Sequence, residues 1–406
     1  MEPMGDLSPR TPLRTRAIRI GMRVAIALAV VLVLRVGAYA VGKENAHALL
    51  DDQAEITLVE RRDYLAARLE DVSDQSGPGG QFGGEWVLVT LSMTAMGTTN
   101  LAFAYPDTIP RARTIVDRCL TLALTKEARA FDTARWNEDA LDTLEGTSPH
   151  IGYLGHLAII LEAKRILGGG EDPHEKPVLA ALRRRVASGA SPILETYPGE
   201  RYTADNMVVA AAIALSEIEA PLVTTERATA SAAVLGRFTS WLEHELLDAE
   251  SGAIVFATDA EGHAKGSARG SGVGWNSLYL PFIDRAIAKR QATVLRDRFR
   301  RPLGPFGGAL CEYDRCAKGA GDVDSGPVVL GTSPSGTGFA IAAAKTLDDA
   351  AWLDDMVSIS EWVGVTISLG GKRRFLIGPL VGDAILLASM SARGEGKSWD
   401  GRYITR

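Results

Sequence analysis

Cysteine, histidine, aromatic side chains and positive charge are all scarce in this chain of 406 residues. The three cysteines and six histidines form no cluster at zinc spacing, because Cys311 and Cys316 have no second pair to complete a site. The formal net charge of −6 leaves no cationic excess to neutralise phosphates, which argues against nucleic-acid binding. With 46% hydrophobic and 23% charged residues, the composition is that of an ordinary folded protein and excludes disordered, collagenous and disulfide-scaffold proteins.

Several sequence motifs of catalysis are also missing. The chain has no serine nucleophile elbow, phosphate-binding loop, dinucleotide fingerprint or HExxH motif. Asp322 and Asp324 suggest calcium, but the 12-residue loop that ends in a bidentate Glu is not there. The sequence therefore predicts no cofactor and no metal site.

The amino terminus is the part with an excess of basic residues. Five arginines against two acids give residues 1–23 a charge of +3, which leaves −9 for the remainder. The apolar run Val24–Leu34 follows, and then the small-x-small site Ala38-Tyr39-Ala40, an order typical of a secretory signal peptide. A membrane span over residues 22–41 is the alternative, provided that Arg35 snorkels. Both interpretations predict export, with the membrane contacted through this helix alone and residues 42–406 outside the cytoplasm.

Three segments are expected along the chain: a signal peptide or anchor at 1–41, an amphipathic helix and linker at 42–84, and the main domain at 85–406. In an exported protein a disulfide between Cys311 and Cys316 becomes plausible, with Cys119 left as a buried thiol.

The main domain is predicted to be all-α, with minor β-hairpin elements. Helices are expected near 85–98, 108–126, 150–167, 175–188, 204–218, 225–248, 273–299, 336–346, 349–364 and 381–392. Strand patterns are limited to 253–258 and 326–331. Helices joined pairwise by long loops, without alternating strands, favour a toroid of helical hairpins. A two-layer α-solenoid is the competitor, but no fixed-period repeat is present.

Polar and aromatic residues concentrate in the loops, where sites on rigid scaffolds are usually built. A toroid would gather these loops around one cavity, whose histidine and carboxylates suit general acid/base catalysis. The candidate catalytic residues are His156, Asp205, Tyr153 and Glu138, and the candidate substrate contacts are Trp136, Tyr197, Glu200, Tyr202, Asn206, Trp275, Asn276 and Asp324.

Structural roles compete with each of these assignments. Helix capping would explain Asp205 or Asn206, which open a helix. A satisfied core histidine would explain His156, and packing would explain Trp136 and Trp275. Glu138 is also typical of a solvated first helical turn.

The order of motifs resembles that of the linalool dehydratase/isomerase family. The matching segments, spread over roughly residues 80–395, are Trp136-Asn137-Glu138-Asp139, Gly155-His156-Leu157, the loop from Tyr197 to Asn206, Asp248-Ala249-Glu250-Ser251-Gly252-Ala253 and Asp322-Val323-Asp324-Ser325-Gly326. The resemblance implies an (α/α)6 barrel, a cyclic homo-oligomer, a periplasmic location and cofactor-free dehydration or isomerisation of a terpene alcohol.

The resemblance also assigns roles. The family enzyme has two active-site cysteines nine residues apart, and here those positions hold Thr196 and Asp205, whereas His156 carries over directly. Asp205 is therefore interpreted as the replacement acid or base and His156 as its partner or as a substrate anchor. Tyr153, Tyr197 and Tyr202 would polarise a substrate oxygen.

Three functions remain open at this point. The first is a lyase or isomerase that acts on a small, terpenoid alcohol in a mostly apolar cavity. The second is a carbohydrate-active enzyme, in which two carboxylates flank a glycosidic bond and tryptophans stack on sugar rings. The third is an exported binding protein without catalysis.

Overall fold

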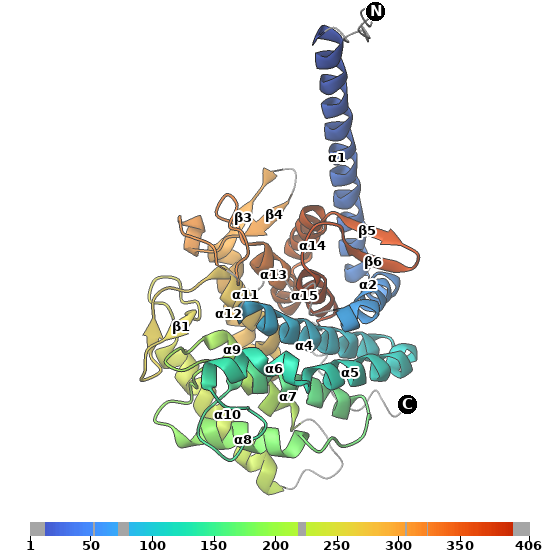
Figure 1. The fold of residues 1–406 in the computed structure, drawn as a ribbon. Coiled ribbons are helices and arrows are strands. Elements are labelled where there is room, and N and C mark those ends of the chain that lie inside the picture. Colours follow the sequence, from blue (N-terminus) through green and yellow to red (C-terminus); the bar gives the residue numbers. More distant parts are fainter. Residues whose placement is uncertain are drawn as a thin grey trace, which may run out of the picture.

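The structure is a computed structural model that describes residues 13–51, 53–71, 81–217, 225–304, 307–322 and 324–392. This part of the chain is mostly helical, which confirms the predicted class, and it contains 14 α-helices (Figure 1). The helices are α1 (Leu13–Leu50), α2 (Glu55–Arg68), α4 (Gln81–Ala104), α5 (Ile109–Ala123), α6 (Lys126–Trp136), α7 (Ile151–Ile166), α8 (Glu175–Ser188), α9 (Thr203–Leu215), α10 (Thr225–Glu245), α11 (Gly270–Ile283), α12 (Arg285–Phe299), α13 (Pro334–Leu347), α14 (Ala350–Gly364) and α15 (Leu380–Ser391).

Six of these helices contact one another in a closed order. Helix α4 packs against α7, α7 against α9, α9 against α11, α11 against α13, α13 against α15, and α15 returns to α4. Each also packs against at least one further helix: α5 and α6 on α4, α8 and α5 on α7, α10 on α9, α12 on α11, α14 and α12 on α13, and α2 on α15.

The sequence explains which helices lie inside. Every residue of α7 from Ile151 to Ala163 is buried, as expected for a helix with apolar side chains around most of its circumference. In α12 the buried residues follow a single stripe that includes Ile287, Gln291 and Leu295, with charged residues on the other side. An inner helix such as α7 therefore has buried side chains on all of its faces. The outer helix α12 has buried side chains on one face only, and that face packs against the inner helices.

One predicted helix is divided in the structure, and another ends a few residues early. The helix expected at 273–299 is α11 followed by α12, because the Asp284 carboxylate caps a new helix by accepting from the Ile287 amide at 2.9 Å. The helix expected at 108–126 ends at Ala123, and Thr125 caps α6.

The predicted separation at residue 84 does not hold for α2, which packs into the main body. Its Arg61 is fully buried and forms ion pairs with Glu361 of α14, at 2.9 Å, and with Asp383 of α15. A buried charge of this kind is tolerated because both partners hydrogen-bond to it. Helix α2 is therefore part of the same packed unit as α14 and α15.

Short antiparallel ribbons join some of the helices. They pair β1 (Ala257–Thr258) with β2 (Ala264–Lys265), β3 (Arg300–Pro302) with β4 (Gly308–Leu310), and β5 (Thr366–Leu369) with β6 (Lys372–Phe375). The strand expected at 253–258 is reduced to β1 and an isolated bridge between Leu247 and Ile254. The piece expected at 326–331 forms only a bridge from Val329 to Thr332. Hairpins β3–β4 and β5–β6 were not anticipated.

Helix α1 projects from the body (Figure 1). Its segment Ala17–Leu50 is long and apolar enough to cross a membrane, and the side chains of residues 17–34 are exposed. The last third of α1 packs along α14. Cys311 and Cys316 form a disulfide, as the sequence suggested, and Cys119 is a buried free thiol.

Candidate active site

The loop before α9 is held in place by Asn206. Its Oδ1 accepts from the Leu194 amide at 2.8 Å, and its Nδ2 donates to the carbonyls of Leu194 and Tyr202 at 3.0 and 2.8 Å. The side-chain amide of Asn206 is thus occupied by backbone groups, and the predicted substrate contact of Asn206 stays a prediction. Asn206 instead fixes the shape of the loop that carries the neighbouring candidates.

Tyr197 extends from this loop toward α4. Residues Tyr197 and Glu200 pair across the turn Pro198-Gly199, with the Glu200 amide donating to the Tyr197 carbonyl at 2.8 Å. The Tyr197 hydroxyl donates to Oε2 of Glu85 at 2.8 Å. The turn therefore positions the Tyr197 hydroxyl against the carboxyl group of Glu85, which lies 112 residues earlier in the chain.

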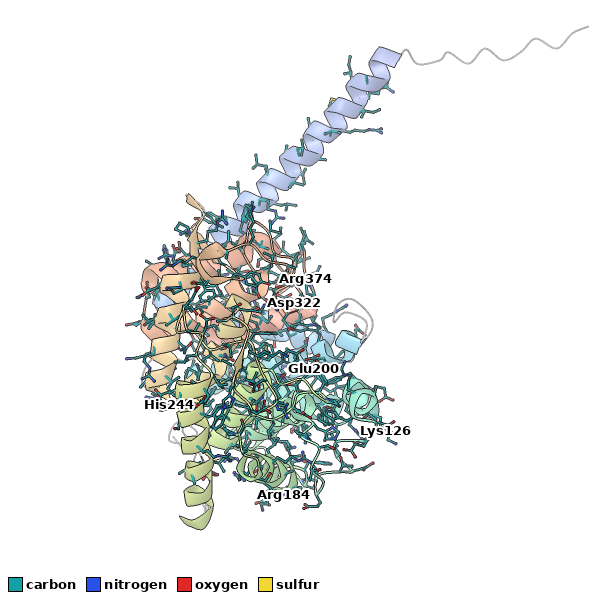
Figure 2. The ribbon with its side chains drawn as sticks, turned by 90° about the vertical axis from the view of Figure 1, so that its left-hand side faces the viewer. Lys126, Arg184, Glu200, His244, Asp322 and Arg374 are labelled. Atoms are coloured by element: carbon teal, nitrogen blue, oxygen red, sulfur yellow. A yellow bond between two sulfur atoms is a disulfide. The ribbon has the colours of Figure 1, made fainter. Side chains whose placement is uncertain are left out.

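Arg135, at the end of α6, fastens the same loop from the other side. Its guanidinium lies 4.6 Å from the centre of the Tyr197 ring and pairs with Glu200. The second oxygen of Glu200 accepts from the Tyr202 hydroxyl at 2.9 Å. Tyr197, Glu200 and Tyr202 are thus brought together, but Glu200 serves to order the two tyrosines. Figure 2 labels Glu200 and Asp322 one above the other on the face that carries these loops.

Glu85 is a further candidate residue, which the sequence reasoning did not select. It is the one charged residue of α4, a helix whose other residues are apolar, small or uncharged polar. Burial, together with the negative charges of Asp205 and Asp324, raises the pKa of Glu85 to about 8. The hydrogen bond from Tyr197 acts in the opposite direction. The sequence signal that could have identified Glu85 is its position as the single acidic residue of an otherwise uncharged helix.

Asp205 lies in the first turn of α9 and is buried. Its Oδ2 accepts a hydrogen bond of 2.8 Å from the Thr196 hydroxyl, so the two side chains are in direct contact. Burial raises the pKa of Asp205 to about 6, and the Thr196 hydrogen bond opposes this shift. The carboxylate does not cap α9, whose first turn starts at Tyr202 without a side-chain cap.

Asp324 enters from the loop before α13. Its backbone amide donates to Asp322 at 3.1 Å, and its carbonyl accepts from the Ser335 hydroxyl. Asp322 is in turn paired with Arg269, which keeps that neighbouring charge compensated. Burial raises the pKa of Asp324 to about 7, with further contributions from Asp322 and Asp205.

Glu85, Asp205 and Asp324 therefore form one electrostatic group, which we call the carboxyl triad. The charge of Asp205 disfavours ionisation of Glu85 and of Asp324, and the charge of Asp324 disfavours ionisation of Glu85. With pKa values near 8, 6 and 7, Glu85 is mostly protonated at pH 7 and Asp205 is mostly ionised. The triad thus holds a proton donor and a proton acceptor at the same pH.

His156 lies one turn deeper on α7 than Gly152. A side chain at Gly152 would meet the Thr196 methyl at 3.3 Å and the Tyr197 hydroxyl at 3.7 Å, which places this face of α7 against the site loop. The imidazole is buried, and burial lowers its pKa to about 3, so it is neutral at physiological pH. Burial is the cause of that shift, and the predicted partnership of His156 with Asp205 stays a prediction. A neutral imidazole remains suited to anchoring a substrate.

Helix α11 presents polar atoms beside His156. The Trp275 ring meets the imidazole edge to face at 5.6 Å and lies 5.9 Å from the ring of Tyr279. Among the described residues, the indole N–H of Trp275, both amide atoms of Asn276, the Tyr279 hydroxyl and Nδ1 of His156 are buried without a hydrogen-bond partner. Such atoms cost free energy unless a ligand or water satisfies them. We call these unpartnered atoms the polar floor. Burial, and to a smaller extent the charge of Asp205, raises the pKa of Tyr279, which links that one hydroxyl to the triad.

Trp136 and Glu138 belong to a neighbouring group. Glu138 lies 3.3 Å from Nε2 of His150, whose Nδ1 is 2.6 Å from Asp132, and the Trp136 ring packs on that imidazole at 5.0 Å. Hydrogen bonds with Ser148 and His150 hold the pKa of Glu138 below its usual value. Glu138 is therefore an ionised partner of His150, and the structure does not place it in the carboxyl triad. The charge of Asp132 contributes to raising the pKa of Tyr197, so the group around His150 acts electrostatically on the loop that carries Tyr197.

Tyr153 does not share a site with His156. Its hydroxyl donates to the Ala123 carbonyl of α5 at 3.0 Å, and the whole side chain is buried. Residues three apart on a helix differ by about 60° in direction, which here separates a neighbour of α5 from a neighbour of α11. The structure gives Tyr153 a packing contact with α5, and its predicted catalytic role stays a prediction.

No family model and no curated protein matches this chain. Among the residues that the structure describes, no cluster of three or more His, Cys, Asp or Glu is arranged to hold a metal ion. The resemblance to the linalool dehydratase/isomerase family accordingly stays a proposal.

Proposed function

We propose that this chain is an exported, membrane-anchored lyase or isomerase that acts on a small alcohol by general acid/base catalysis without a nucleotide cofactor. The carboxyl triad carries the proposal, because a protonated Glu85 and an ionised Asp205 at one site supply both partners of a proton transfer. Raised pKa values that arise from burial together with like charge are characteristic of functional sites.

The proposed scaffold is an (α/α)6 toroid. The closed order of contacts through α4, α7, α9, α11, α13 and α15 supports it, with each of these helices packed against at least one outer helix. Five of the six inner helices carry residues of the triad, of the polar floor or of the aromatic cluster around Trp275. These residues are Glu85, His156, Asp205, Trp275 and Phe339. A cyclic homo-oligomer is the further implication of the resemblance to the linalool dehydratase/isomerase family.

In the proposed dehydration, Glu85 gives its proton to the substrate hydroxyl as the C–O bond breaks and water leaves. Asp205 takes a proton from the adjacent carbon, and the electrons of that C–H bond form the new C=C bond. Exchange with water then returns a proton to Glu85 and removes one from Asp205. Tyr197 orients the donor and Thr196 orients the acceptor, through hydrogen bonds of 2.8 Å each.

An aromatic wall supports a hydrophobic, alkenol-type substrate. The Trp275 ring packs against Phe339 at 5.4 Å and against Tyr279 at 5.9 Å. Aromatic faces stabilise positive charge, which develops on carbon when an allylic C–O bond breaks before the proton is removed.

The polar floor favours a second candidate function. A ligand with several hydroxyl groups would satisfy Asn276, Tyr279 and the indole N–H of Trp275, and two carboxyls beside it are the equipment of a glycoside-cleaving enzyme. A binding protein for such a ligand would use the same floor without the triad.

We also propose that α1 is retained as an anchor and that the body lies outside the cytoplasm. Helix α1 runs without interruption through Ala38-Tyr39-Ala40, and Ala38 is buried in the contact of α1 with the body, whereas cleavage would require this segment to open. The Cys311–Cys316 disulfide supports an oxidising compartment.

The test is turnover by the full-length chain in detergent, offered a panel of terpene alcohols and a panel of oligosaccharides. Consumption of an alkenol, lost in Glu85→Gln and in Asp205→Asn but kept in Tyr153→Phe, is the expected result. Cleavage of an oligosaccharide without turnover of any alkenol would replace the lyase assignment with the second candidate. Binding of either class without turnover would leave only the binding protein.

A further inference from the structure

Most of the exposed large hydrophobic side chains lie on α1 itself. Outside that helix the exposed ones are Ile56, Val329, Leu330, Val363, Leu369, Leu376 and Ile377. Within the described side chains from 83 to 217 and from 231 to 304, no large hydrophobic residue is exposed. A soluble body rarely exposes apolar side chains in one region unless that region contacts something.

Three of these residues lie where α1 leaves the body. Arg35 of α1 donates to the carbonyls of Trp362 and Val363 at 2.6 and 3.0 Å, which puts Val363 beside α1. The amides of Leu376 and Ile377 donate to the carbonyls of Val365 and Gly364 at 3.1 and 2.9 Å. Val363, Leu376 and Ile377, which are 41, 49 and 55% exposed, therefore form one patch next to Arg35, called the collar below.

The length of α1 indicates how far the membrane extends toward this collar. The uninterrupted apolar run from Val24 to Leu34 covers only about 17 Å at 1.5 Å per residue, against a hydrocarbon core of about 30 Å. Arg35 need not end the span, because its guanidinium is turned onto the last carbonyls of α14 and stacks on Trp362 at 5.1 Å. With Arg35 directed inward, the exposed apolar surface of α1 continues through Val36, which is 61% exposed.

We propose that the body docks on the outer leaflet of the membrane through the collar, so that lipid contacts Val363, Leu376 and Ile377 as well as α1. This rests on the proposed anchoring by α1 and adds a second contact, which fixes the orientation of the body. The membrane is the expected partner of the collar for two reasons. The collar continues the apolar surface of α1, and it lies where a membrane-spanning helix of ordinary length would end.

Hairpin β5–β6 extends this contact. It ends in the turn Gly370-Gly371, with both residues in the left-handed region, between the paired residues Leu369 and Lys372. Leu369 is 74% exposed and Lys372 is exposed beside it. An apolar tip next to a cation suits the boundary between acyl chains and anionic headgroups. In Figure 1 this hairpin lies beside α1, near the level at which α1 leaves the body.

The other end of the body supplies a control. Figure 1 places α10 at the end away from α1, and Figure 2 labels its His244 far from Arg374 of the β5–β6 hairpin. Ala233 is an exposed small residue of α10. A probe at this position should remain in water.

The experiment uses the full-length chain, reconstituted into vesicles of phosphatidylcholine and phosphatidylglycerol that contain spin-labelled lipid. Variants with one added cysteine, Leu376→Cys, Leu369→Cys, Val30→Cys and Ala233→Cys, carry an environment-sensitive dye. The unsubstituted chain, whose free thiol Cys119 is buried, reports background labelling. Substitution at Leu376 or Leu369 removes no core contact, because both side chains are exposed.

Quenching of the dyes at positions 376 and 369, several-fold above that at Ala233, is the expected result and supports docking. Quenching at Val30 alone would show that α1 is anchored while the body stands off the membrane, and would overturn the collar. If the dye at Val30 is not quenched, α1 does not anchor the protein in the membrane, and the proposed docking through the collar fails as well. Protection of position 376 by a second copy of the chain, without quenching, would also overturn the proposal.

Discussion

The Tyr197 hydroxyl donates a hydrogen bond to the Glu85 carboxyl at 2.8 Å, and it thereby joins the loop before α9 to the first turns of α4. This bond lowers the pKa of Glu85, against the larger effect of burial. The phenol therefore decides at which pH the proposed proton donor loses its proton.

Removing that phenol should move one limb of the pH profile. Activity that needs protonated Glu85 and ionised Asp205 is expected to be bell-shaped between about pH 6 and about pH 8. In Tyr197→Phe the pKa of Glu85 rises, so the alkaline limb of kcat/KM should move to higher pH while the acid limb stays. Rate profiles of both proteins test this, and an alkaline limb that does not move would contradict the assignment of Glu85.

Replacing Glu85 should stabilise the protein at alkaline pH. Because folding raises the pKa of Glu85 from 4.5 to about 8, the native state holds a proton that the unfolded chain releases, and the free energy of unfolding falls as pH rises through this window. We expect Glu85→Gln to be more stable than the parent by about 1 to 2 kcal/mol at pH 8 and similar to it at pH 4.5, by denaturant unfolding. Glu145→Gln, at a side chain that is 90% exposed, is the control. The same pH dependence in parent and Glu85→Gln would rule out a raised pKa.

His156 is expected to bind substrate as a neutral group. In His156→Asn the loss of one hydrogen bond should reduce kcat/KM by about tenfold, mainly through KM, with both limbs of the pH profile unchanged. The limbs should not change because burial lowers the pKa of the imidazole to about 3, so that it does not titrate in the range of the profile. Tyr153→Phe should leave kcat/KM unchanged and cost about 1 kcal/mol of stability. An acid limb that disappears in His156→Asn would instead make the histidine a titrating catalyst.

Arg61 should be critical for stability although it lies outside the site. Arg61→Met leaves Glu361 and Asp383 buried without their cation, and we expect a loss of about 3 to 5 kcal/mol in the free energy of unfolding. Arg290→Met breaks the exposed pair with Glu243 and should cost less than about 1 kcal/mol. Equal losses in the two variants would show that α2 is not held by its buried charge.

Composition and periodicity were sufficient for the helical class, the apolar amino-terminal helix and the Cys311–Cys316 pair. They also placed Tyr197, Asp205 and Asp324 among the candidates, because these polar residues stand in loops between apolar helices. Glu85 was missed because its importance comes from the packing of α4 beside the α9 loop, which no local pattern records. The directions of Tyr153 and Glu138 depend on which helix each one faces, and for this reason spacing alone misplaced them.

The most direct test of the carboxyl triad is an infrared titration of the Glu85 carboxyl, obtained as the difference between the parent and Glu85→Gln across pH 4 to 10. A protonated carboxyl band that persists at pH 7 and disappears near pH 8 is the predicted result. A Glu85 that is already ionised at pH 6 would contradict the presence of a proton donor at this site, and with it the proposed acid/base chemistry.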